Sequence, residues 1–354
     1  MAAAVEAEPL RVALFHTDLK RDGPGLLLRD ILKGEDRQIE AVAAVVRAAE
    51  PDVIVVAGVD YDLGGHAVSA LAEVIGGYPH RISVAPNRGV DARGDRNGDG
   101  YVGDPDDAQG YGEFRGQSGI AVLSRFALGA ATDHTGFLWA DLEGNIAPEG
   151  LAPDQRLATT SHLVVPVHTP DTPFDLALWH ATPPVFDGPE DRNGRRNHDE
   201  AAFWLRWLDT APEHVVLAGV ANLDPVDGDG RPGALNALLQ HPKLWDPVPV
   251  SLGGVADAAA QGGINATHSG DPARDTADWR DDAGRPGNLR VDYVLPSTAF
   301  AVMASGVFWP EAASLRRDVL DASRHRLVWV DLCAKRDTEC LNGIGRPKPG
   351  QQLR

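Results

Sequence analysis

The residues whose types and spacing most clearly indicate chemistry lie in one acidic loop between positions 95 and 106. Carboxylate or amide oxygens fall at loop positions one, three, five and twelve, and a backbone carbonyl is available at position seven. Gly100 stands at position six, where a cation-binding loop must turn sharply. Hard cations prefer clustered oxygen ligands, so this spacing predicts a structural Ca²⁺ site. The predicted ligands are Asp95, Asn97, Asp99, Tyr101 and Asp106.

The same residue types are also typical of an ordinary acidic turn, because Asp, Asn and Gly are favoured in turns. The flanking segments do not read as the two helices of an EF-hand, so an ion here would order the loop. A second acidic run, Asp224-Pro-Val-Asp227-Gly-Asp229-Gly230, leaves the same choice between a cation site and a turn. Both interpretations stay open for both runs.

Apolar periodicity predicts an alternation of strands and helices around these loops. Short β-branched runs predict strands over 11–15, 52–56, 120–124, 176–179, 214–217, 291–295 and 327–330, and helical spacing predicts helices over 39–49 and 198–208. Two Gly/Asp/Pro-rich stretches, at about 86–116 and 251–288, predict long loops. We expect one domain over 10–332 and a C-terminal tail over 333–354.

The 354 residues carry a net charge of -18, with an isoelectric point near 5.0. This balance disfavours sequence-independent nucleic-acid binding, which depends on Lys and Arg neutralising phosphates. A small anionic ligand is compatible with it. The two cysteines, Cys333 and Cys340, suit either a short-loop disulfide in an oxidising compartment or two thiols in a reducing one. The sequence does not indicate an oligomeric state.

No apolar run approaches the ~18 residues of a membrane helix, and Met1 to Leu10 does not read as a signal peptide. A cytoplasmic location is expected if no signal peptide was removed. A periplasmic or secreted location follows if a signal was trimmed.

Four segments resemble, in order, the endonuclease/exonuclease/phosphatase superfamily, which has a pancreatic deoxyribonuclease-like fold. They are Trp179-His180-Ala-Thr, Leu217-Ala-Gly219-Val220-Ala-Asn222, Arg290-Val-Asp292-Tyr293-Val and Ser323-Arg324-His325. Superfamily members usually read G-D-x-N, R-x-D-Y-V and S-D-H at the last three. The resemblance runs from about Arg11 to Leu332. It implies an α/β fold, a four-layered α/β/β/α sandwich with two central mixed sheets.

The resemblance also implies roles for four residues. His325 matches the catalytic histidine that contacts the scissile phosphate, and Asp292 matches the carboxylate that orients it. Asn222 matches the amide that positions the phosphate or the water, and His180 matches a second histidine beside the phosphate. Together they imply a clamp for a phosphate ester.

The metal side of the superfamily pattern is degenerate here, as in a bacterial subgroup that this chain resembles. His16 stands where members usually have Asn, and Gly58 stands where they have a metal-binding Glu. Val220 replaces the Asp that acts on the attacking water, and Arg324 replaces a metal-ligating Asp. Asp60 or Asp18 could rebuild a site for Mg²⁺ or Mn²⁺ if a strand end were displaced.

Several other residues are candidate contacts to the substrate. Arg324 is either a guanidinium that replaces the charge of the metal or an ordinary surface arginine. Arg196 and Asn197, after the His180 strand, are either substrate contacts or parts of the next helix, with Asn197 as its cap. His16 is a further candidate contact to the substrate.

Three functions remain open. The first is hydrolysis of a phosphate mono- or diester through the His-Asp clamp, and the second is an inactive family member that binds an anionic ligand or partner. The third, a true nuclease, is disfavoured by the net charge of -18 and by Val220.

Overall fold

The computed structural model describes residues 8–335, 337 and 340–341. Two mixed β-sheets lie at its centre, each with one parallel pair of neighbouring strands, β1–β2 in the first and β8–β9 in the second. The first sheet has the order β13 (Phe300–Phe308), β14 (Leu327–Ala334), β1 (Leu10–His16), β2 (Val53–Val59), β4 (Gly119–Ser124) and β3 (His80–Ser83). The second has the order β12 (Asp292–Pro296), β9 (Val215–Val220), β8 (Phe174–His180), β7 (His162–His168) and β5 (Ala127–Leu128), with β6 (Thr132–Asp133) also paired to β7.

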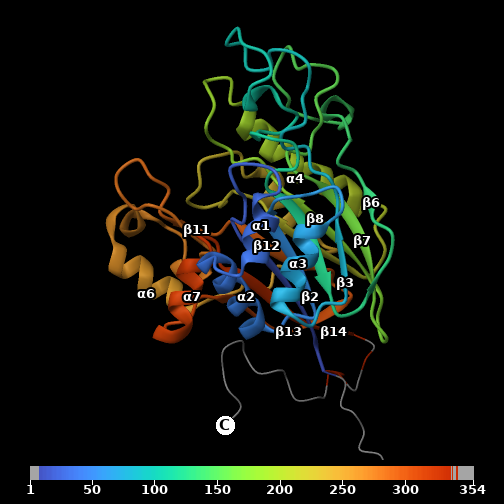
Figure 1. Cartoon of the computed structure of the whole chain (residues 1–354), viewed down its shortest axis with the longest axis vertical. Helices are drawn as coiled ribbons and strands as arrows, with labels where there is room; N and C mark the ends of the chain where they lie inside the picture. Colours follow the sequence, from blue (N-terminus) through green and yellow to red (C-terminus); the bar gives the residue numbers. More distant parts are fainter. Residues whose placement is uncertain (1–7, 336, 338–339, 342–354) are drawn as a thin grey trace, which may run out of the picture.

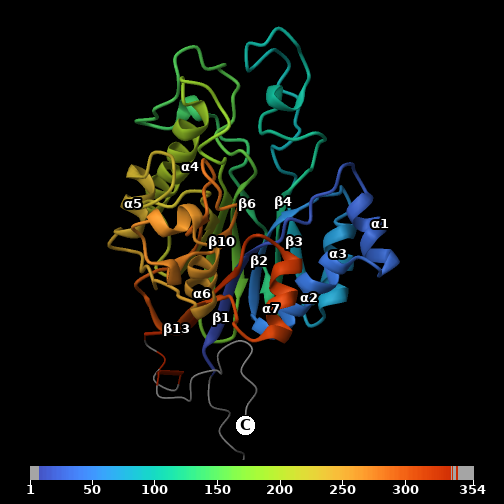
Figure 2. The same cartoon turned by 90° about the vertical axis from the view of Figure 1, so that its left-hand side faces the viewer.

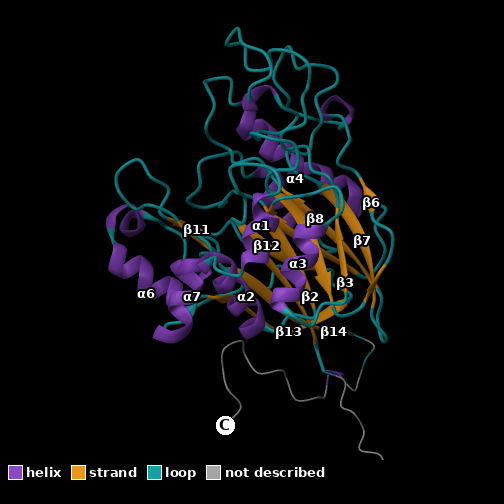
Figure 3. Ribbon diagram, viewed as in Figure 1, coloured by secondary structure: helices purple, strands orange, loops and turns teal. Residues whose placement is uncertain are grey.

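Helices cover the outer face of each sheet, which confirms the predicted four-layered sandwich (Figures 1–3). The first sheet packs against α1 (Leu26–Lys33), α2 (Arg37–Ala49), α3 (His66–Ile75) and α7 (Ala313–Ala322). The second packs against α4 (Arg192–Leu208) and α5 (Gly233–Leu239). Because all four layers share buried apolar faces, the two sheets are held in one orientation.

The alternation of side chains along the strands decides which residues lie between the two sheets. In β1, Ala13 and Phe15 pack against the helices, whereas Val12 and Leu14 pack against the opposite sheet. Leu176 and Leu178 of β8 face inward in the same way. His16 and His180 follow Leu14 and Leu178 by two residues, so they lie on the same inner faces, at the ends of their strands.

The predicted strands and helices are present, with boundaries that differ by a few residues. The expected loop 251–288 differs more, because it contains helix α6 (Leu252–Gln261), two 3₁₀ turns and the two-stranded ribbon β10 (Ala277–Asp278) and β11 (Asn288–Leu289). The side chain of Ser251 caps α6 by accepting a hydrogen bond from the backbone of Gly254. The two glycines in its first turn disfavour a helix, and the sequence prediction missed it for this reason. The Ser251 cap and four alanines favour the helix.

Strand β14 extends through Ala334, two residues into the expected tail, and the rest of that tail from 342 onward lies outside the described residues. Cys333 and Cys340 form a disulfide, with 5.8 Å between their Cα atoms. Among the helices that the structure describes, none is both long and apolar enough to cross a membrane.

A buried ion pair joins β1 and β14, which are neighbours in the first sheet and come first and last in the chain. Arg11 of β1 donates from Nε and Nη2 to the two carboxylate oxygens of Asp331 of β14, at 2.7 and 2.8 Å. The third donor group, Nη1, bonds to the carbonyl of Ala49 at the end of α2. The guanidinium also lies over the Trp329 ring, 4.6 Å from its centroid. Since both charged groups are excluded from water, each depends on the other for its solvation.

Replacing Asp331 by Asn should therefore destabilise the protein by about 3–5 kcal/mol, because it leaves the Arg11 charge buried and uncompensated. Urea unfolding at neutral pH measures this change. As a control, Arg37→Ala removes an exposed guanidinium that pairs with Asp318 and Asp321, and it should change the unfolding midpoint little. Equal effects of the two substitutions would contradict this account.

Candidate functional site

The candidate site lies between the two sheets, where strands of both reach the same end of the sandwich. His16 is the last residue of β1, His180 is the last of β8, and Asp292 is the first of β12. His325 precedes β14 by two residues. In Figure 2, β1 runs from the end near the marked C-terminus toward the end that carries the long loop 86–116. The fold thus brings together residues that lie up to about three hundred positions apart.

His325 and Asp292 form a buried pair, as the resemblance implied. Their contact joins His325 Nδ1 to Asp292 Oδ2 at 2.8 Å, and the two residues are 5% and 0% exposed. This bond leaves Nε2 as the nitrogen of His325 that a ligand can use. The backbone N–H groups of Val291 and Asp292 both donate to Oγ1 of Thr276, at 2.9 and 3.0 Å. Thr276 therefore holds the start of β12, a role that was not predicted from the sequence.

Ser323 connects two of the histidines through their backbones. Its hydroxyl donates to the carbonyl of His16 at 2.7 Å and accepts from the backbone N–H of His325 at 3.0 Å. The serine of the S-x-H segment is thus a positioning residue that ties the end of β1 to the start of β14.

Three imidazoles stand close together at this end of the sandwich. The centroid of the His16 ring lies 4.3 Å from that of His325 and 4.9 Å from that of His180. Trp279 closes the group with its ring perpendicular to His325, at 5.4 Å. Nδ1 of His16 and Nδ1 of His180 are buried and have no hydrogen-bond partner among the described residues. Burial and the neighbouring His325 lower the pKa of His16 to about 3, and burial also lowers that of His180 well below its ordinary value.

The ring of His16 occupies the space above Gly58. A Cβ atom built on Gly58 would lie 2.9 Å from His16 Nε2 and 3.0 Å from Cε1, closer than real contacts allow. Gly58 also has a left-handed φ of 73°, and it interrupts the register between β2 and β4. A glycine is therefore required here on two grounds, its backbone conformation and the neighbouring ring. The glutamate expected in relatives and the histidine of this chain exclude each other.

The residues that could rebuild a metal site are engaged elsewhere. Asp60 accepts hydrogen bonds from the backbone of Ser118 on one oxygen and of Arg21 on the other, at 2.9 and 2.8 Å. Asp18 faces Arg324, whose Nε lies 3.6 Å from its carboxylate. Burial raises the pKa of Asp18, but His16, His325 and Arg324 outweigh it and lower the pKa overall.

Val220 lies fully buried between His180 and Asp292, with which it pairs in register on either side. Among the described residues, no group of three or more His, Cys, Asp or Glu side chains is arranged to hold a metal ion. The donor set at this end of the sandwich therefore does not fit the divalent cation on which the superfamily usually relies.

Two cations near the histidines were not predicted. Arg88, from the loop 86–116, donates from Nε to Oγ1 of Thr160 and from Nη1 to the carbonyl of Tyr111, at 3.0 and 3.3 Å. Thr160 precedes β7 by two residues, and β7 and β8 pair from His162 and Trp179 onward, so Arg88 lies near the end of β8 that carries His180. Besides burial, the charges of Arg88 and Lys20 lower the pKa values of His16 and His180. A lone arginine in a Gly/Asp-rich loop carries no sequence signal that would have identified it.

Asn222 lies just beyond the end of β9, with a left-handed φ of 52°. Its side-chain amide donates to the carbonyl of Ala181 at 2.8 Å, next to His180. This bond orients the side chain toward the ends of β8 and β9, within the region where the resemblance places it.

Arg196 and Asn197 occupy structural positions, and the expected substrate contact is not supported. Arg196 is 5% exposed and donates to four backbone carbonyls, those of Gln109, Arg156, Leu157 and Ala158. Asn197 is 3% exposed and donates to the carbonyls of Thr182 and Ala221. It is not the helix cap either, because α4 begins earlier, at Arg192. Both side chains anchor loops whose backbone would otherwise be unsatisfied.

In the acidic loop, the side chains bind the loop's own backbone. Asp95 accepts from the N–H groups of Gly98 and Gly100, and Asp99 accepts from that of Tyr101. Burial and neighbouring carboxylates raise the pKa of Asp106. These bonds are those of an acidic turn, and Ca²⁺ binding at this loop stays a prediction of the sequence.

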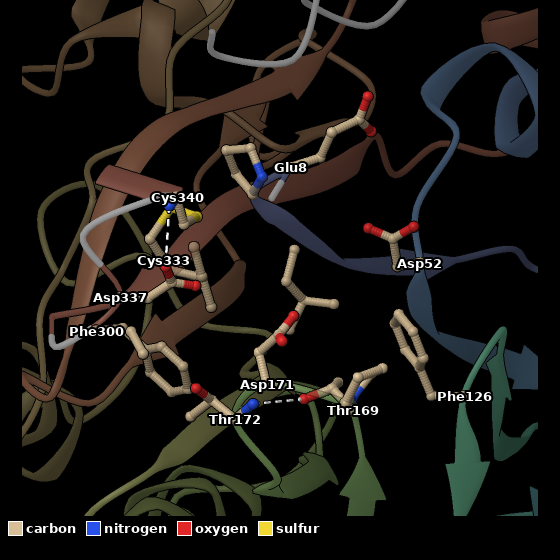
Figure 4. Close-up of a pocket in the computed structure, with 15 residues that line it drawn as sticks. Glu8, Asp52, Phe126, Thr169, Asp171, Thr172, Phe300, Cys333, Asp337 and Cys340 are labelled. Carbon is tan, nitrogen blue, oxygen red and sulfur yellow. Dashed lines mark hydrogen bonds between the residues drawn. A yellow bond between two sulfur atoms is a disulfide. The ribbon is translucent and has the colours of Figure 1, made fainter. Parts of the chain in front are cut away.

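A separate cavity of about 250 Å³ lies at the other end of β1, beside Leu10 and the Cys333–Cys340 disulfide (Figure 4). Phe126 and Phe300 line it together with acidic side chains, among them Asp52 and Asp171. None of the predicted site residues contributes to it, because His16 stands at the opposite end of the strand.

The sequence profile of the endonuclease/exonuclease/phosphatase family matches residues 31–325, and the chain belongs to this family. Members of the family typically depend on divalent metal ions. No curated protein matches the chain.

Solved structures resemble the chain over most of its length. An endonuclease/exonuclease/phosphatase from Beutenbergia cavernae DSM 12333 is 22% identical with a TM-score of 0.53, covering 93% of this chain and 72% of that one. A family protein from Leptotrichia buccalis C-1013-b is 13% identical with a TM-score of 0.52, covering 92% and 99%. The human Nocturnin catalytic domain with bound sulfate anion is 16% identical with a TM-score of 0.50, covering 94% and 95%. At these identities the likeness shows the fold.

Replacing Ser323 by Ala should lower the free energy of unfolding by about 1–3 kcal/mol, because the buried carbonyl of His16 and the N–H of His325 lose their shared partner. Urea unfolding measures the loss. The ring signals of His16 and His325 in an NMR spectrum should move with it. Ser323→Thr keeps the hydroxyl and should retain both the stability and the ring signals. Unchanged signals in Ser323→Ala would show that this serine does not position the histidines.

The buried histidines predict a loss of stability in acid. The unfolded chain binds protons near the ordinary histidine pKa of about 6.5, whereas folded His16 stays neutral down to about 3, so stability should fall as the pH drops below about 6.5. His16→Asn should reduce this fall by about 2 kcal/mol at pH 5. Urea unfolding at pH 5 and pH 7 measures it. The exposed His66, changed to Gln, should leave the pH dependence unaltered.

Proposed function

We propose that this member of the endonuclease/exonuclease/phosphatase family binds the phosphate group of a mono- or diester between its two sheets, at His325, His180 and Asn222. The observation that carries the proposal is the buried His325–Asp292 contact of 2.8 Å, which lies beside the two further imidazoles of His16 and His180. A carboxylate behind a histidine orients the ring and stabilises its charged form. His325 can then donate from Nε2 to a phosphoryl oxygen.

The surroundings of the pair suit an anion. His180 adds a second imidazole, and Arg88, bonded to Thr160 near the end of β8, adds positive charge. Charge-assisted hydrogen bonds to phosphate are stronger than neutral ones, and they gain further in a partly buried site. The bound sulfate of the human Nocturnin domain is consistent with an anion site in this fold, but the identity is only 16%.

Hydrolysis of the bound ester is the second candidate, and the intact His325–Asp292 pair favours it. What opposes it is Val220, a fully buried apolar residue where relatives usually place the aspartate that acts on the attacking water. An inactive family member that retains binding is the simpler outcome of this exchange. A nuclease is disfavoured further, because a net charge of -18 repels a polyanion outside the cleft.

His325→Ala should weaken the binding of a phosphate ester by at least about tenfold, which corresponds to about 1.4 kcal/mol and is typical of one lost charge-assisted bond. Asp292→Asn should weaken it as well, because the ring loses the carboxylate that orients it. Calorimetric titration with phenyl phosphate and diphenyl phosphate, with and without Mg²⁺, measures these affinities. The exposed His66→Ala serves as the control and should bind as the unsubstituted protein does.

Phenol release from the same two esters, in Mg²⁺ or Mn²⁺, decides between the two candidates. Release that is abolished in His325→Ala would establish a hydrolase, and binding without release would establish an inactive member. If neither ester binds under any of these conditions, the proposed function is wrong.

A further inference from the structure

We infer that this site holds its phosphate group without a divalent cation, and that His16 and Arg88 take the place of the metal ion and its ligands. The inference rests on the proposed function and concerns how the same site works. It follows from the way in which four departures from the family pattern fit together in space.

The first step is the mutual dependence of His16 and Gly58. The His16 ring lies within 2.9–3.0 Å of the position that a Cβ on Gly58 would take. The ring cannot move aside easily, because it packs against the His325 and His180 rings. Its backbone carbonyl is also held by Ser323. The imidazole therefore fills the space from which a glutamate at position 58 would reach a metal ion.

The second step is the loss of carboxylates that face the site. Both oxygens of Asp60 accept backbone hydrogen bonds, and Val220 has no ligand atom. Asp292 is engaged with His325 through one oxygen, and its other oxygen is buried with no hydrogen-bond partner in the described part of the chain. Asp18 faces the cation Arg324. A divalent cation needs several oxygen ligands that converge, and this arrangement does not provide them.

The third step is the charge that replaces them. Arg88 uses Nε and Nη1 for hydrogen bonds within the protein, and no hydrogen bond of its Nη2 occurs among the described residues. These two hydrogen bonds hold the Arg88 side chain in place, and burial lowers its pKa. Arg324, which is 64% exposed, adds a further cation opposite Asp18. Fixed guanidinium donors bind phosphate oxygens with defined geometry.

These steps give a site in which imidazole and guanidinium groups surround the anion. Among the described residues Nδ1 of His16 and of His180 has no hydrogen-bond partner, and the two residues are 7% and 3% exposed. The guanidinium groups of Arg88 and Arg324 would repel a divalent cation at this end of the sandwich.

The test uses the full chain after treatment with EDTA, titrated calorimetrically with inorganic phosphate in the absence and presence of Mg²⁺, Mn²⁺ or Zn²⁺. We expect the same affinity in all four conditions. Arg88→Gln and His16→Asn should each weaken phosphate binding about tenfold or more, and Arg88→Lys should recover part of the loss. Arg47→Gln removes one positive charge from an exposed position on α2 and should have no effect.

Gly58→Ala offers an independent check, because the added Cβ should displace the His16 ring and weaken phosphate binding. If that variant does not fold, the Arg88 variants still decide the question. Phosphate binding that requires Mg²⁺, Mn²⁺ or Zn²⁺ would overturn the metal-free site and leave the proposed function standing. Metal-free binding that is unaffected by Arg88→Gln and His16→Asn would overturn the assignment of these residues. A protein that binds phosphate under none of these conditions would overturn both proposals.

Discussion

The packing of two apolar sheet faces against each other is the constraint on which the rest of this structure depends. Val12, Leu14, Leu176 and Leu178 belong to this inner core, and strand alternation makes the next inward positions His16 and His180. Strands of both sheets terminate at the same end of the sandwich, so their polar terminal residues lie close together. No local sequence signal marks this convergence. The candidate site therefore lies where the apolar core between the two sheets ends.

Polar groups that are buried at this end of the sandwich require hydrogen-bond partners, and the hydrogen bonds there supply them. Ser323 serves the backbone of His16 and His325, and Thr276 serves the start of β12 beside Asp292. The His325–Asp292 pair satisfies one nitrogen and one oxygen. In the part of the chain that the structure describes, Nδ1 of His16 and of His180 stays without a hydrogen-bond partner.

The departures from the family pattern form one coherent change in this structure. His16 requires Gly58, because the ring fills the space of any side chain at that position. Arg324 faces Asp18, and Arg88 brings a cation from a distant loop to the end of β8 that carries His180. A site that usually gathers carboxylates around a cation has thereby become one that gathers cations and imidazoles. This reversal of charge is the physical basis for an anion ligand.

The sequence by itself predicted seven strands through apolar periodicity, and its resemblance to the family implied the four-layered fold and the His325–Asp292 pair. It did not determine which polar residues face the site. The sequence left a substrate contact and a structural role open for Arg196 and Asn197, and the structure shows both buried and bonded to loop carbonyls. Arg88 had no motif, and the helix at 252–261 was hidden by its glycines. Only the tertiary structure decided these, because burial and hydrogen-bond satisfaction depend on segments that are distant in the chain.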